Sequence, residues 1–84
     1  MQTDDPRIEA IDAALAGEWD RAHVIVQVRS DELSCWIHAV LHKIEGDASN
    51  SRYWYARTSH EYGRYENPRQ ELESIRSAIL DLRG

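Results

Sequence analysis

Two histidines, His38 and His42, are the residues of this sequence whose type and spacing are best suited to chemistry. Side chains four positions apart on a helix project from successive turns of one face, so two imidazoles at this spacing can share a metal ion. A third ligand must then come from elsewhere in the chain. The available side chains are His23, Glu45, Asp47 and His60. Of these we favour His23 or Glu45 as the residue that completes a divalent-metal site.

The same two histidines also fit a structural role. With successive residues about 100° apart, they fall opposite the apolar stripe of their predicted helix, together with Glu45 and Cys35. This predicts either a solvated face or imidazoles that donate hydrogen bonds to a neighbouring helix. The residue after His38 is Ala39, so the full HExxH motif of metalloproteases is missing. On the residues alone, the structural role of His38 and His42 is favoured over the metal or catalytic role.

His23 and Cys35 are also favoured as structural residues. His23 lies beside the apolar side of its predicted helix, where a histidine usually bonds to a backbone carbonyl. It becomes a ligand only if the helices pack so that it meets His38 or His42. Cys35 lies in the middle of a helix with no neighbour that indicates a reactive thiolate, so a catalytic Cys–His pair with His38 is disfavoured.

Five helices account for the apolar pattern of the chain, at about residues 6–16, 19–29, 31–45, 48–60 and 68–82. Residues typical of helix ends bound them: Asp5-Pro6, Gly17, Ser30, Gly46-Asp47 and Asn67-Pro68. Four of the five residues 24–28 are β-branched and would suit a strand, but no second strand is available to pair with them. Short connections between helices predict an all-α fold of stacked antiparallel helical hairpins, in a single domain over residues 1–84.

The third and fifth helices carry apolar stripes that should face the core. In the third helix the stripe consists of Leu33, Trp36, Ile37, Val40, Leu41 and Ile44. In the fifth helix it consists of Leu72, Ile75, Ala78, Ile79 and Leu82. The orientation of the third helix also decides where its two imidazoles lie.

Three consecutive aromatic residues, Tyr53, Trp54 and Tyr55, point in three directions from the fourth helix. Such a helix lies between two neighbours or places one aromatic ring on a partner. Together with Arg57 they form a candidate interaction surface, because Trp, Tyr and Arg concentrate binding energy at protein interfaces. Aromatic and basic residues also alternate in grooves that bind single-stranded nucleic acid, which is a further alternative.

Composition narrows the range of partners. A net charge of −5 with a single lysine, Lys43, argues against DNA and anionic membranes as partners.

No apolar run reaches the ~20 residues of a membrane span, and the acidic N-terminus does not resemble a signal peptide, so we expect a cytoplasmic protein. One cysteine allows no intramolecular disulfide. With 84 residues the core is small, so a homodimer and a monomer are equal expectations.

Two blocks of the sequence follow a recognisable pattern. They are Trp19-Asp20-Arg21-Ala22-His23 with Gln27, and Trp36–Asp47 continued by Asn50–Tyr55 and Arg57. Over residues 8–60 the chain resembles a family of small helical proteins, found in bacteria and fungi, for which no function is established. Family members continue into a small-residue turn, whereas this chain has Thr58-Ser59-His60. A weaker similarity to Sel1 and tetratricopeptide hairpins lacks the internal repeat of those arrays. The resemblance implies helical hairpins and no particular activity.

The residues favour a non-enzymatic protein-interaction or assembly module that self-associates through the aromatic helix and needs no cofactor. The alternative is a small metal-binding protein or metal-dependent enzyme, which uses His38 and His42 with His23 or Glu45. The third hypothesis is a protein that binds single-stranded nucleic acid.

Overall fold

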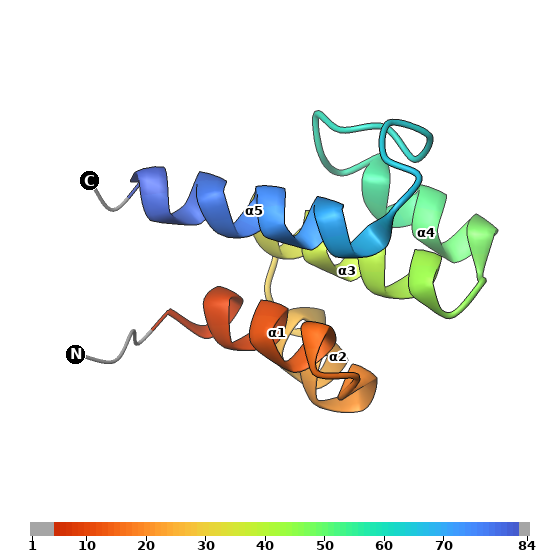
Figure 1. Ribbon diagram of the computed structural model, residues 1–84. Helices are drawn as coiled ribbons and strands as arrows, with labels where there is room; N and C mark the ends of the chain where they lie inside the picture. Colours follow the sequence, from red (N-terminus) through yellow and green to blue (C-terminus); the bar gives the residue numbers. More distant parts are fainter. Residues whose placement is uncertain (1–4, 83–84) are drawn as a thin grey trace.

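The computed structural model describes residues 5–82. This part of the chain contains five α-helices, joined by turns and loops, and no strands (Figure 1). They are α1 (Pro6–Leu15), α2 (Trp19–Gln27), α3 (Glu32–Ile44), α4 (Ala48–Tyr55) and α5 (Pro68–Leu82). The predicted all-α fold is therefore confirmed, and residues 24–27 of the β-branched segment belong to α2 rather than to a strand. Within the described residues, no helix has the length and apolar character that crossing a membrane requires.

The central element is α3, which packs against all four other helices. Short turns join α1 to α2 and α3 to α4, and each pair packs as a hairpin, while α5 runs along α3 and α1 (Figure 1). Every residue from Ser34 to His42 is buried as a result. The prediction of a solvated face on this helix is therefore wrong, because neighbouring helices cover it on both sides.

Aliphatic side chains from four helices form the core. The largest fully buried ones are Ile11, Val26, Ile37, Val40, Leu41, Leu72, Ile75 and Ile79. Two residues expected in the inward stripes are exposed instead, Ile44 by 45% and Leu82 by 71%. Each is the last residue of its helix, where the side chain extends past the helices that cover the preceding turns.

Two predicted helix ends differ from the structure. Asp31, not Ser30, caps α3, and its carboxylate accepts hydrogen bonds from the Ser34 amide at 3.0 Å and the Ser34 hydroxyl at 2.8 Å. A charged acceptor makes a stronger cap than a hydroxyl. The fourth helix ends at Tyr55 rather than near residue 60, and the Thr58 amide and hydroxyl both donate to the Tyr55 carbonyl, at 2.9 and 2.8 Å.

The turn between α3 and α4 requires a glycine. Gly46 has a φ of +85°, a conformation that side chains with a Cβ disfavour, and Asp47 then caps α4 by accepting from the Asn50 amide at 3.1 Å. The predicted structural role of this pair is thus confirmed.

Replacing Gly46 by Ala should lower the free energy of unfolding by about 1 kcal/mol, measured by urea denaturation. No atom lies within 4 Å of the added Cβ, so the cost comes from the backbone conformation alone. Gly63→Ala is the matched control, because Gly63 also has open space but no positive φ. Equal stability of the two variants would contradict the assignment of strain to Gly46.

A buried carboxylate, which the sequence did not single out, links α5 to α3 and α4. Glu71 is fully buried and accepts from the Trp36 indole at 2.8 Å, the Tyr55 hydroxyl at 2.5 Å and the Lys43 ammonium at 2.8 Å. Lys43 also lies over the rings of Tyr55 and Tyr62, at 4.9 and 5.2 Å. Burial, followed by the hydrogen bond to Glu71, raises the pKa of Tyr55 far above its usual range, so its hydroxyl remains a donor.

Candidate metal centre

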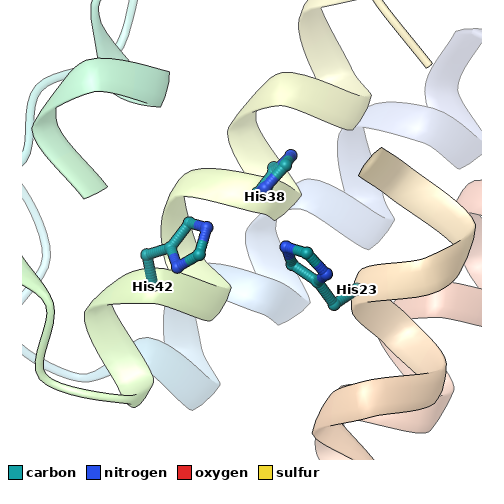
Figure 2. A group of neighbouring side chains, drawn as sticks. All are labelled: His23, His38 and His42. Carbon is teal, nitrogen blue, oxygen red and sulfur yellow. The ribbon is translucent and has the colours of Figure 1, made fainter. Parts of the chain in front are cut away.

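Three histidines from two helices converge on one space (Figure 2). His38 and His42 project from successive turns of α3, and His23 reaches toward them from α2. The ring centroids are 4.7 Å apart for His23–His38, 5.3 Å for His23–His42 and 4.9 Å for His38–His42. One nitrogen from each ring lies within 4.8 Å of the other two. His23 therefore meets both partners, which is the condition under which the sequence made it a ligand candidate.

The packing of α2 on α3 places His23. The Trp19 indole on α2 donates to the Leu41 carbonyl of α3 at 2.7 Å, and Ala22 is fully buried in the same helix. A residue as small as alanine lets two helices approach closely. Trp19 precedes His23 by four positions, and the two rings stack at 4.8 Å with an angle of 10°. Trp19 therefore fixes both the helix and the imidazole.

A second tryptophan covers the opposite side of the cluster. Trp54 on α4 stacks on His38 at 3.9 Å with an angle of 15° between the rings. The histidine cluster thus lies between two indoles, one from α2 and one from α4. The Trp19–His23 spacing is a signal in the sequence, whereas nothing in the sequence indicates the Trp54 contact, which depends on how α4 folds back on α3.

Burial determines the electrostatics of the cluster. His38 and His42 are only 4% and 5% exposed, and His23 is partly buried. Burial, together with the neighbouring His23 and His42, lowers the pKa of His38 to about 4. Burial is also the main cause that lowers the pKa of His23. Both imidazoles are therefore neutral at pH 7, which is the form that binds metal ions.

His38 also contains a polar atom whose bonding is not satisfied by the described residues. Its Nδ1 is buried and makes no hydrogen bond to any of residues 5–82. A buried polar group without a partner costs about 1–3 kcal/mol, so an atom of this kind is uncommon unless it serves another purpose. Coordination of a cation in the histidine cluster would supply such a purpose.

Glu45 contacts the cluster without joining it. Its carboxylate forms a hydrogen bond with Nδ1 of His42, one turn earlier on α3. Glu45 and Asp47 form a second group with His42, and both carboxylates are exposed. His60, the remaining histidine, stacks on Trp36 at 3.5 Å. Of the four candidate third ligands, the structure thus brings His23 to both histidines of the pair, and Glu45 and Asp47 to His42.

Comparison of the chain with protein-family models, with curated proteins and with solved structures found no match. The resemblance to a family of small helical proteins therefore stays a prediction.

The residues of the predicted interaction surface do not share one face. Tyr53 is 53% exposed and accepts a hydrogen bond from Arg57 at 2.9 Å, so these two lie together on the surface. Tyr55 is buried, with its hydroxyl on Glu71, and Trp54 packs on the histidine cluster. Two of the four residues thus serve the interior of this protein.

Cys35 lies away from any reactive arrangement. Its thiol is buried, and the sulfur is 3.8 Å from the Ser30 carbonyl, to which it donates. Burial raises the pKa of this thiol, which opposes formation of the nucleophilic thiolate. A structural role for Cys35 agrees with its place in the helix.

Proposed function

We propose that this protein binds a single divalent transition-metal ion between α2 and α3, with His23, His38 and His42 as ligands. The observation that carries the proposal is the convergence of three imidazoles, each with a nitrogen within 4.8 Å of the others. Imidazoles are rarely gathered in a protein interior, because each loses hydrogen bonds to water on burial. A shared cation compensates all three at once.

The geometry requires only a small adjustment to hold an ion. With zinc–nitrogen bonds of about 2.0–2.1 Å, the ligand atoms of a tetrahedral site lie about 3.4 Å apart. The ligand nitrogens lie within 4.8 Å of one another, and rotations of the imidazole rings would bring them closer. Imidazole ligands suit Zn²⁺, Cu²⁺, Fe²⁺ and Ni²⁺ rather than Mg²⁺ or Ca²⁺.

Three protein ligands leave one coordination position for an exogenous ligand, as in catalytic rather than structural zinc sites. An ion held in this way supplies Lewis acidity to whatever occupies that position. In the chain itself, Trp19 and Trp54 stack on two of the ligands and limit the access of solvent. The metal-binding function thus gains support over the assembly and nucleic-acid functions, whose proposed surface is divided between interior and exterior.

The test is a titration of protein that carries no affinity tag and has been freed of metal by dialysis against a chelator. Calorimetry with Zn²⁺ should give one ion per chain, and Co²⁺ should give the visible absorption of a tetrahedral site. Substitution of each ligand in turn should abolish or strongly weaken binding: His23→Gln, His38→Gln and His42→Gln. His60→Gln is the matched control and should bind as the wild type does, because this ring stacks on Trp36. Absence of saturable binding to the wild type overturns the proposal.

A further inference from the structure

The hydrogen bond between Glu45 and His42 fixes which atom of His42 faces the cluster. An ionised carboxylate only accepts hydrogen bonds, so the proton of this bond belongs to Nδ1 of His42. In a neutral imidazole the other nitrogen, Nε2, then carries the lone pair that can bind a metal ion. Figure 2 shows the ring of His42 turned toward His38 and His23.

We propose that Glu45 is the positioning residue of the metal centre, which holds His42 in the Nδ1–H tautomer and presents Nε2 to the ion. This inference rests on the proposed function, since it assigns a role within the same site. Ligand histidines commonly donate their second ring N–H to a carboxylate, which fixes the ring and raises its basicity. Glu45, the C-cap residue of α3, has that relation to His42 at i+3.

The position of Glu45 separates this role from that of a direct ligand. The groups that could hold an ion divide into His23, His38 and His42 on one side and His42, Glu45 and Asp47 on the other, with His42 shared. In the first group His38 and His42 are buried and His23 is partly buried, whereas both carboxylates of the second group are exposed. The group of His42, Glu45 and Asp47 does not by itself constitute a metal site. We therefore assign Glu45 a supporting role at the site formed by His23, His38 and His42.

The affinity test uses a matched pair of carboxylate-to-amide substitutions, Glu45→Gln and Asp47→Asn. Both remove one negative charge close to His42, so they share any long-range effect on a cation, and only Glu45→Gln weakens the contact with Nδ1. Zn²⁺ titration should show binding weakened about 10- to 100-fold in Glu45→Gln, with one ion per chain retained. Asp47→Asn, whose amide oxygen still caps α4, should stay within about 3-fold of the wild type.

A second readout needs no metal. Nitrogen-15 NMR of the metal-free wild type should show His42 with its proton on Nδ1, and Glu45→Ala should lose this preference. Glu45 is exposed at the end of α3, so the substitution leaves the fold intact, which circular dichroism checks. If Glu45 had a purely structural role, its substitution would change neither the tautomer of His42 nor the affinity for zinc.

Each outcome is decisive for one claim. Failure of the wild type to bind metal overturns the proposed function, whereas normal binding by Glu45→Gln overturns only the role of Glu45. An Nδ1 without its proton in the wild type also overturns that role. Asp47→Asn could weaken binding as much as Glu45→Gln does while His23→Gln binds normally. The ion would then lie among His42, Glu45 and Asp47, and both the proposed ligands and the role of Glu45 would be wrong.

Discussion

Replacing Glu71 by Gln should lower the free energy of unfolding by about 3–5 kcal/mol, measured by urea denaturation in the presence of a chelator. The carboxylate of Glu71 receives donors from Trp36, Tyr55 and Lys43, all in the interior. An amide of the same shape turns an N–H group toward at least one of these donors. It also leaves the Lys43 ammonium, whose side chain is only 10% exposed, without its counter-ion. For a domain of this size the loss is a large part of the total stability.

The matched control lies two residues along the same helix. Glu73→Gln removes an exposed carboxylate that pairs with Arg76 at 3.2 Å, and it should cost less than about 1 kcal/mol. The double variant Glu71→Gln/Lys43→Met should recover part of the loss, because it removes the stranded charge as well. A loss below about 1 kcal/mol in Glu71→Gln would show that the buried pair does not stabilise the fold.

The sequence could not indicate the role of Glu71, for a physical reason. Its neighbours Arg69 and Gln70 are exposed, so the local pattern is that of the solvated start of a helix. Its partner Lys43 is 28 positions away in the chain. The available signal was chemical: a single lysine in a chain otherwise rich in arginine, and indole and phenol donors that need an acceptor when buried. Finding that acceptor requires the packing of α5 on α3.

The histidine cluster was partly accessible from the sequence. The spacing of His38 and His42 placed them correctly on one side of α3, because helical periodicity fixes the relative directions of side chains. Periodicity does not say how many neighbours cover a helix, so the sequence left open whether the side opposite the apolar stripe faces water or a neighbouring helix. In the structure that side receives α2, with His23, and α4, with Trp54. Helix type and order followed from local sequence, while burial of the imidazoles followed from tertiary packing.

Replacing His38 by Phe should abolish metal binding and, in a chelator at pH 7, raise the free energy of unfolding by about 1 kcal/mol. The substitution removes a buried Nδ1 that has no hydrogen-bond partner within residues 5–82 and keeps an aromatic ring for Trp54 to stack on. Removing an unsatisfied polar group recovers part of its cost of about 1–3 kcal/mol, and the slightly larger Phe ring offsets some of that gain. Urea denaturation of both proteins measures the difference.

The advantage of the variant should grow as the pH falls. His38 has a pKa of about 4 in the folded protein, because it is buried and lies close to His23 and His42. The indole of Trp54 stacks on its ring. In the unfolded chain the pKa of His38 is near 6.5, so between these two values the unfolded state takes up the proton first and the wild type loses stability. The His38 contribution is fully present above about pH 6.5, and about 2 kcal/mol of it is lost by about pH 5. The difference in unfolding free energy between His38→Phe and the wild type should widen by that amount.

Adding Zn²⁺ should reverse the order of stability. An ion that binds only the folded wild type adds about 2.7 kcal/mol at about 100 times its dissociation constant, whereas the variant gains nothing. This reversal distinguishes a metal-binding His38 from a structural one. If His38 were structural, His38→Phe would be less stable than the wild type both in chelator and with zinc. A loss of more than about 2 kcal/mol in chelator, with no response of the wild type to zinc, would make His38 a core residue. The imidazoles would then be gathered for packing alone, and their unsatisfied nitrogen would have no compensation in the folded protein.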